Sequence, residues 1–285
     1  MSLRINQNID AFNSYRNLSV TQGQMSKSLE KLSSGFRINR AADDAAGLAI
    51  SEGLRAQVGG LKVAVRNAQD GISVVQTAEG ALTETHSILQ RMRDLSVQAS
   101  STGSQDSDAR SAAQTEFSQL NEELDRIATT TAFGGQKLLD MAGTAYQGTF
   151  QVGANGSSSD QIAVDLSTAA FGSSSLTGFD SAGLGVGALD LTTAGTAAID
   201  AIDTAVKGVS TARATLGAYQ NRFEHTINNL SVAVENLSAS ESRIRDTDMA
   251  QEMVAFTRSQ ILTQAGTSML AQANQAPQNV LSLLR

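Results

Sequence analysis

The spacing of residues in the first forty positions constrains the fold more than any other feature of the sequence. One series recurs at alternating intervals of four and three, at Ala11, Tyr15, Leu18, Gln22, Met25, Leu29, Leu32 and Phe36. This heptad spacing predicts a helix that packs along one stripe against a partner helix, with Gln22 as the one polar slot. The chain has a single proline, Pro277, so long helices can continue without a proline break.

Four further segments show helical spacing. The first begins at Asp44 and ends near Ser100, with a stripe at Leu54, Val58, Leu61, Val65, Ala68, Ile72, Val75, Leu82, Leu89, Met92 and Leu95. At 1.5 Å per residue this helix would be about 80 Å long. After a polar turn at 100–108, a second helix is expected through Ala113, Phe117, Leu120, Leu124 and Ile127. The short connection predicts that these two helices are antiparallel.

The C-terminal part carries the other two helical stripes. One consists of Ile199, Ile202, Val206, Val209, Leu216, Tyr219, Phe223, Ile227, Leu230, Val234, Leu237 and Ile244, and the last of Leu262, Ala265, Met269, Ala273, Ala276 and Val280. The two terminal segments have similar lengths, so each is the expected partner of the other. Ordering about 40 residues at each end costs about 1–2 kcal/mol per residue in backbone entropy. We therefore expect both ends to be loose in the free chain and to fold only on association.

The middle of the chain has a different character. Residues 148–166 alternate apolar and polar side chains around Asn155-Gly156, which predicts a β-hairpin. Residues 167–195 are rich in Gly, Ser and Thr, and we expect a surface-exposed connection without its own core. The predicted fold class is mainly α, a long antiparallel helical coiled-coil rod formed by the N- and C-terminal segments, with a small middle region that contains the hairpin.

Composition and motifs argue against several functions. The chain has no cysteine, and its net charge of -7 with scattered basic residues argues against nucleic-acid binding. Its two histidines, His86 and His225, lie in helical patterns away from acidic clusters with ligand spacing, so no metal site is expected. The sequence GLGVG at 183–187 lacks the Lys-Ser/Thr ending of a phosphate loop. We therefore expect no catalytic residues, no cofactor and no enzymatic activity.

The stretch LSSGFRINRAADDAAGLAI, residues 32–50, allows two interpretations. Its Arg37, Arg40, Asp43 and Asp44 resemble an acid–base cluster, but no partner base or pocket motif lies near them. Alternatively the stretch is a joint between two helices, where Gly35 ends the first and Asp43 or Asp44 caps the second. The arginines are then available to pair with carboxylates of the same or a neighbouring chain. We adopt the joint.

Six stretches closely resemble one known family. They are LSSGFRINRAADDAAGLAISEGLRAQVGGL, LQRMRDLSVQAS, FQVGAN, LGAYQNRF, NLSASESRIRDTDMAQEM and ILTQAGTSMLAQANQAPQNVLSLLR. Over residues 1–165 and 198–285 the chain resembles bacterial flagellin. The resemblance implies a structural subunit that self-assembles into the helical filament of the bacterial flagellum for swimming motility. In that family the terminal helices line a central channel, and longer helices form the tube around it.

The resemblance also implies partners and a location. Flagellins leave the cell unfolded through the flagellar type III export apparatus, without a cleaved signal peptide, and function in the extracellular flagellum. A chaperone binds their C-terminal segment, here about 246–285, and hook-associated and filament cap proteins are further partners; neither nucleic acid nor membrane insertion is expected.

A receptor contact is a further implication of the resemblance. By spacing alone, Arg91, Leu95 and Gln98 form an ordinary exposed helix stripe. In many flagellins the corresponding helix is detected by animal Toll-like receptor 5, and the matching positions here are Arg91, Leu95 and Gln98, with Glu116 on the neighbouring helix. The resemblance implies that this activity belongs to the monomer, because the same surface is buried between subunits of the filament.

The expected domain organisation is nearly symmetric about the middle. It comprises an N-terminal inner-core helix at 1–43, rod helices at 44–140, a hairpin region at 141–166, a variable surface segment at 167–197, a C-terminal rod helix at 198–245 and a C-terminal inner-core helix at 246–285. Two alternatives stay open: a hook–filament junction protein with the same terminal helices, and a coiled-coil binding module such as a secreted adhesin.

Overall fold

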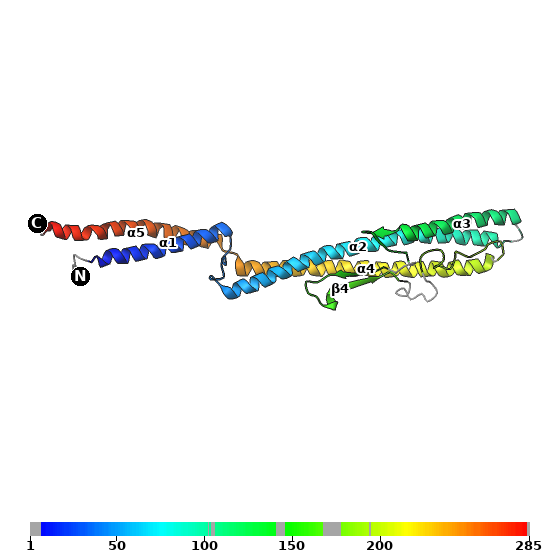
Figure 1. Cartoon of the computed structure of the whole chain (residues 1–285), viewed down its shortest axis with the longest axis horizontal. Coiled ribbons are helices and arrows are strands. Elements are labelled where there is room, and N and C mark those ends of the chain that lie inside the picture. Colours follow the sequence, from blue (N-terminus) through cyan, green and yellow to red (C-terminus); the bar gives the residue numbers. More distant parts are fainter. Residues whose placement is uncertain are drawn as a thin grey trace. The chain divides into compact units, whose positions relative to one another are not determined.

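The computed structural model describes residues 7–101, 103, 106–140, 146–167, 178–193 and 195–283, with side chains as far as Gln275. Its elements are α1 (Ile9–Ser34), α2 (Ala45–Ala99), α3 (Ser107–Thr130), β1 (Ala132–Phe133), β2 (Gln136–Lys137), β3 (Gln147–Gln151), a 3-10 turn (Ser158–Asp160), β4 (Gln161–Asp165), α4 (Gly195–Arg245) and α5 (Met249–Leu283) (Figure 1). The mainly α prediction is confirmed.

Two compact units divide the chain. One contains the residues up to Gln57 and those from Glu235 onward, and the other contains residues 58–234. We call them the terminal unit and the central unit. The expected domain boundaries at 43/44 and 245/246 stay a prediction.

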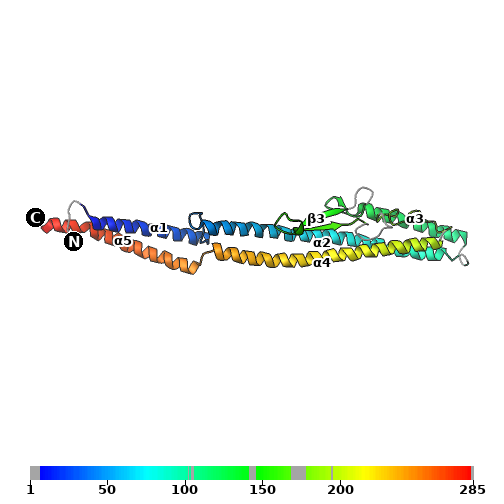
Figure 2. The same cartoon turned by 90° about the horizontal axis from the view of Figure 1, so that it is seen from below.

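The central unit contains the large core. Here α2 and α4 lie side by side, and α3 lies along the C-terminal part of α2 (Figures 1 and 2). The largest fully buried side chains of these three helices are Leu82, Leu89, Met92, Phe117, Leu124, Ile202 and Phe223. Each belongs to a stripe predicted from spacing, and the predicted α2 stripe is buried or half-buried throughout. These heptad predictions are confirmed.

Close packing in this core depends on one glycine. Gly71 of α2 is buried, and a Cβ atom added there would lie 2.7 Å from Cζ of Phe223 on α4. The Phe223 ring therefore occupies the space that any other residue at position 71 would fill. Its edge also meets Phe150 of β3, with ring centroids 5.5 Å apart and planes at 89°. One aromatic side chain thus joins α2, α4 and the hairpin.

The predicted hairpin is confirmed. β3 and β4 pair antiparallel from Gln147 opposite Asp165 to Gln151 opposite Gln161. Asn155-Gly156 lies in the nine-residue loop between the strands instead of forming a two-residue turn, and the backbone N–H of Asn155 donates to Asp160 at 3.2 Å. A second hairpin, β1–β2, was missed in the sequence analysis. Its turn is Gly134-Gly135, with φ of 58° and 83°, values at which glycine avoids the steric cost of a Cβ atom.

Residues 178–193 correct the expectation of an exposed connection. Four apolar side chains of this segment, Phe179, Leu184, Val186 and Leu191, are at most 2% exposed and join the central core. Polar groups of α3 hold the backbone: Asp125 accepts from the Ser181 N–H at 2.7 Å, and Gln114 accepts from the Leu191 N–H at 2.8 Å. The apolar side chains of this segment are buried in the core that the neighbouring helices form. Residues 168–177 of the same expectation lie outside the described residues.

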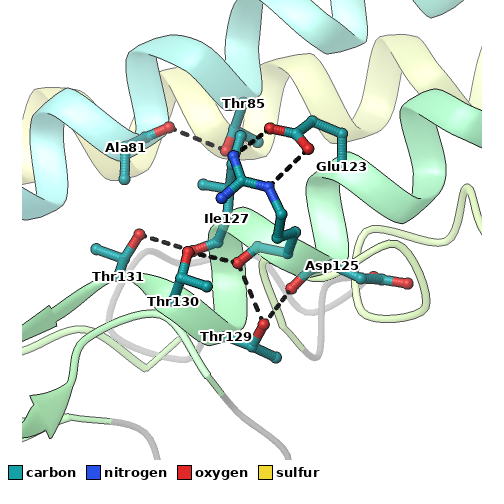
Figure 3. A network of polar contacts seen from close by, with 9 residues as sticks. Ala81, Thr85, Glu123, Asp125, Ile127, Thr129, Thr130 and Thr131 are labelled. Atoms are coloured by element: carbon teal, nitrogen blue, oxygen red, sulfur yellow. Dashed lines mark hydrogen bonds and ion pairs between the residues drawn. The ribbon is translucent and has the colours of Figure 1, made fainter.

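The C-terminal part of α3 carries three hydroxyl hydrogen bonds and one ion pair. Thr129, Thr130 and Thr131 each donate to the carbonyl four residues earlier, at 2.6–2.8 Å, and Glu123 pairs with Arg126 (Figure 3). These hydroxyls share their acceptors with the helix backbone, since the Ile127 carbonyl, for example, also accepts from the Thr131 N–H at 3.1 Å. α3 thus ends without a C-terminal glycine, directly before β1.

The terminal unit pairs α1 with α5, as expected from their lengths (Figures 1 and 2). The predicted heptad positions of α1 are half right. We call the row of residues on each helix that faces the other helix the seam. Ala11, Leu18, Met25 and Leu32 lie on the seam of α1, but the alternate seam positions are Ser14, Thr21 and Ser28. Tyr15 and Leu29, which the spacing placed on the seam, are 64% and 56% exposed.

The seam of α5 also differs from the prediction. It consists of Glu252, Ala255, Phe256, Ser259, Thr263, Gly266, Leu270 and Ala273. Of the predicted stripe, Ala273 is on the seam, Leu262, Ala265 and Met269 are exposed, and the side chains of Ala276 and Val280 lie outside the described residues. Small seam residues bring the helices close, because a Cβ atom at Gly266 would lie 3.2 Å from Leu18.

Candidate assembly surface

The terminal unit exposes many large apolar side chains. On α1 they are Ile9, Phe12, Tyr15, Val20 and Leu29, each 56–73% exposed, and on α5 they are Met249, Met253, Val254, Ile261, Leu262 and Met269, each 48–60% exposed. We call these eleven residues the terminal apolar surface. Isolated exposed apolar residues are normal, but contiguous apolar surface on a folded unit marks an interaction site.

Helix geometry shows how little of this surface α1 can cover. Successive residues of a helix are 100° apart, so Met249 and Met253 flank the seam of α5 on one side. Leu262 flanks it on the other side, and Ile261 and Val254 lie opposite the seam. Large apolar side chains on several sides of a helix are stabilised when neighbours cover those sides, which one partner helix cannot do.

A shallow groove lies on the uncovered side of α5. Its walls are Met253, Val254, Ile261 and Leu262, with Thr257 and Arg258 as the polar members. No hydrogen bond or ion pair of the Arg258 guanidinium is found among the described residues. The groove therefore offers an apolar contact surface with one positive charge at its margin.

No helix among the described residues is both long enough and apolar enough to cross a membrane.

The expected joint is a crossing of two chain segments inside the terminal unit. Gly35 ends α1 with φ of 76°, and its carbonyl accepts from the Thr247 N–H at 3.0 Å. Phe36 forms an isolated antiparallel bridge with Asp246, and the Arg245 guanidinium lies 4.8 Å from the centre of the Phe36 ring. The segment between α1 and α2 is thus tied to the segment between α4 and α5.

The four charged residues of the stretch have separate structural tasks. Of the two capping candidates, Asp43 and Asp44, it is Asp44 that caps α2 by accepting from the Gly47 N–H at 2.8 Å. Arg37 donates to the Ile244 carbonyl at 2.8 Å, and Arg40 pairs with Glu30 of α1 at 2.8 Å. These bonds place the four residues in and around the connection between α1 and α2, and their roles as an inter-domain joint and in contacts between subunits stay predictions.

Asp43 shapes the loop before α2 and gives it a pH dependence. Its carboxylate accepts from the N–H groups of Arg40 and Asn39, and these bonds lower the pKa of Asp43 below its ordinary value of 3.8. A lowered folded-state pKa means that the stabilisation is present at neutral pH and lost as the pH falls through that pKa.

In Asp43→Ala we expect amide exchange at Asn39 and Arg40 to be about tenfold faster at pH 6, measured by NMR. The Arg110 amide, which donates to the Asp106 carbonyl at the start of α3, is the control and should exchange at an unchanged rate. Unchanged exchange at Asn39 and Arg40 would contradict the proposed role of Asp43.

Of the four positions matched to receptor recognition in the sequence analysis, the structure pairs two, exposes a third and buries the fourth. Arg91 and Glu116 form an ion pair at 2.7 Å between α2 and α3, with side chains 55% and 44% exposed. Gln98 is exposed, but Leu95 is 3% exposed and belongs to the central core. The expected exposed stripe is therefore wrong at Leu95.

The remaining sequence candidates have structural surroundings. His86 lies 2.9 Å from the Gln90 side chain in the same helix, and His225 is exposed on α4. In the described part of the chain, no three His, Cys, Asp or Glu side chains are grouped so that they could hold a metal ion. Within 183–187, Leu184 and Val186 are buried, so this loop is anchored by its apolar side chains.

Comparisons with known proteins match both helical regions of the chain. Residues 5–144 match the bacterial flagellin N-terminal helical region, and residues 199–284 match the bacterial flagellin C-terminal helical region. The flagellin of Halalkalibacterium halodurans is 55% identical over 99% of both chains, and that of Bacillus subtilis is 52% identical over 99% of this chain and 100% of the relative. Flagellin FlaB2 of Treponema pallidum is 47% identical over 99% of both. The crystal structure of Bacillus cereus flagellin aligns with a TM-score of 0.45 at 28% identity, covering 58% of this chain and 88% of the other.

Proposed function

The chain belongs to the bacterial flagellin family and is a structural subunit of the flagellar filament, and on this premise we propose that its subunits join through the terminal apolar surface. The observation that carries the proposal is the exposure of apolar side chains on every side of α5. Neighbouring copies would cover what α1 leaves bare, and the area removed from water would stabilise the filament.

The thin seam supports folding on association. The most buried described residues of α1 and α5 are Ser28 and Ser259, each 7% exposed, whereas α3 and α4 bury Phe117 and Phe223 completely. Burial of small hydroxyl-bearing residues offsets little of the backbone entropy that ordering two helices costs. We therefore propose that the terminal helices gain most of their stability from neighbouring subunits. Contacts between different faces of successive copies give an open helical polymer.

Family membership supports further proposals on partners and route. We propose export of the unfolded chain without a cleaved signal peptide, with a chaperone on residues 246–285. Its exposed apolar side chains, such as Val254 and Leu262, would need protection before assembly. Hook-associated and filament cap proteins would meet the same terminal surfaces at the filament ends, outside the cell. This role is structural and requires no catalytic group.

A second proposed partner is an animal Toll-like receptor 5, which would bind the free monomer. The exposed Arg91–Glu116 pair supports this proposal, because it presents both charges on adjacent helices. Gln98 is available on the same helix as Arg91. Leu95 would act only indirectly, by supporting the helix from the core.

Deletion of residues 246–285 tests the proposed function. We expect the truncated chain to form no filaments, because α5 and its apolar surface are gone. The central unit should stay folded, since its core does not use these residues. Negative-stain microscopy of concentrated protein and far-UV circular dichroism measure the two outcomes, with the full-length chain as control. Filaments of the truncated chain would count against the proposal.

A further inference from the structure

Methionines are concentrated on the exposed sides of α5. Of the seven methionines in the chain, Met249, Met253 and Met269 are 48%, 50% and 58% exposed. Met92 is 0% exposed in the core of the central unit. Oxidation of a thioether to a sulfoxide depends on access of the oxidant. Among the described methionines, the three of α5 are therefore the most reactive, Met25 is half-buried on the seam of α1, and Met92 is a built-in control.

The surroundings of these side chains determine what oxidation would do. Met253 lines the groove of α5 together with Val254, Ile261 and Leu262, and Met249 lies one helical turn before it. None of the three aliphatic neighbours can donate a hydrogen bond to a new oxygen atom. The Thr257 hydroxyl already donates to the Met253 carbonyl, and Arg258 lies about 140° around the helix from Met253. A group that enters an apolar contact without a donor loses its hydration and gains nothing in return.

We propose that Met249, Met253 and Met269 form an oxidation site at which hydrogen peroxide prevents the free subunit from assembling. This inference rests on the proposed role of the terminal apolar surface in assembly. The sulfur lone pair attacks one peroxide oxygen, an S–O bond forms and the O–O bond breaks. The departing hydroxide takes up the proton of the oxygen that the sulfur attacked and leaves as water. The thioether is oxidised to the sulfoxide, and the peroxide is reduced.

Assembly itself would protect the site. In the filament the proposed contacts cover α5, so oxidant would reach the three sulfur atoms only in subunits that have not yet been incorporated. The sulfoxide is also reversible, because methionine sulfoxide reductases restore the thioether. The site therefore distinguishes free from assembled subunits by chemical access alone.

The test compares peroxide-treated and untreated full-length subunits. Peptide mapping by mass spectrometry should find sulfoxide at Met249, Met253 and Met269 and none at Met92. The critical concentration for filament formation should rise at least about tenfold and return to its original value after treatment with both methionine sulfoxide reductases. The variant M249L/M253L/M269L should assemble equally well with and without peroxide, because leucine keeps the surface apolar.

Three results would overturn the proposal. They are normal assembly of subunits oxidised at all three positions, equal loss of assembly in the leucine variant, and failure of the reductases to restore assembly. If the leucine variant does not assemble even untreated, the reductase rescue of the original chain decides. Failure of the untreated original chain to polymerise would instead refute the proposed function and this inference together.

Discussion

An Ile261→Asp chain will remain soluble as a folded subunit and form no filaments. Ile261 is 60% exposed and lies opposite the α1–α5 seam, so the substitution removes little packing within the chain. In the filament a neighbouring copy would cover this position, and an unpaired carboxylate would be buried at a cost of several kcal/mol. Each subunit would carry this cost, so the whole polymer would be affected.

The matched control for this prediction is Ile261→Leu, which keeps both the apolar character and nearly the volume of the side chain. We expect it to assemble at a critical concentration within a fewfold of the original. Sedimentation of polymer from monomer measures both variants, and circular dichroism confirms that their helix content is unchanged. Assembly of the aspartate variant at the control's critical concentration would show that this side of α5 stays exposed in the filament.

Phe223→Ala will lower the free energy of unfolding of the central unit by about 3–5 kcal/mol. The ring is 0% exposed, it fills the space above Gly71, and it meets Phe150 edge to face. Removing it leaves a cavity at the point where α2, α4 and the hairpin join. Urea denaturation followed by circular dichroism measures the change.

Gly71→Ala provides an independent check of the same contact. Helix propensity alone predicts a gain of about 1 kcal/mol for this substitution. The structure predicts a loss, because the new Cβ atom would lie 2.7 Å from the Phe223 ring. Exposed Gly80, with no atom within 4 Å of an added Cβ, is the control position and should show the gain. A stabilised Gly71→Ala chain would contradict the packing described here.

The central helices were predictable because both heptad positions carry apolar residues. In α2, for example, Val58, Ala68, Val75 and Leu82 are buried as their spacing indicates. The hairpin β3–β4 followed from strand alternation in the same way. The β1–β2 hairpin could have been found from Gly134-Gly135, a dipeptide typical of two-residue turns.

Apolar spacing predicted half of the seam positions of α1 wrongly, and the reason is physical. Spacing identifies the stripe with the largest apolar residues, and here that rule selects Tyr15 and Leu29, which α5 leaves exposed. The actual seam uses Ser14, Thr21 and Ser28, whose small side chains let the helices approach. A sequence that must bury one face within the chain and others between chains cannot be divided by periodicity alone.

Burial was predicted wrongly at two further places, residues 178–193 and Leu95, because it was inferred from the character of the whole segment and not from its individual side chains. Residues 178–193 are dominated by small residues, yet a few apolar side chains such as Phe179 and Leu191 suffice to dock them on the central core. Leu95 was grouped with Arg91 and Gln98 by intervals of four and three, but it also belongs to the apolar stripe of the same helix, and it is this stripe that determines its burial. The end of α1 at Gly35 and a cap of α2 by Asp43 or Asp44 were predictable because these residues are local signals that need no tertiary context.

The seam of α1 and α5 has an ambiguity of alignment. Small residues recur every seven positions on both helices, at Ser14, Thr21 and Ser28 and at Ser259, Gly266 and Ala273. Sliding one helix by a heptad, about 10.5 Å, would place small residues opposite small residues again. Directional bonds at the two ends remove this degeneracy: the Asn8 side chain donates to the Ala273 carbonyl at 2.7 Å, and the Gly35 carbonyl accepts from Thr247. The interior of the pair sets how closely the helices approach, and its ends set which residues face each other.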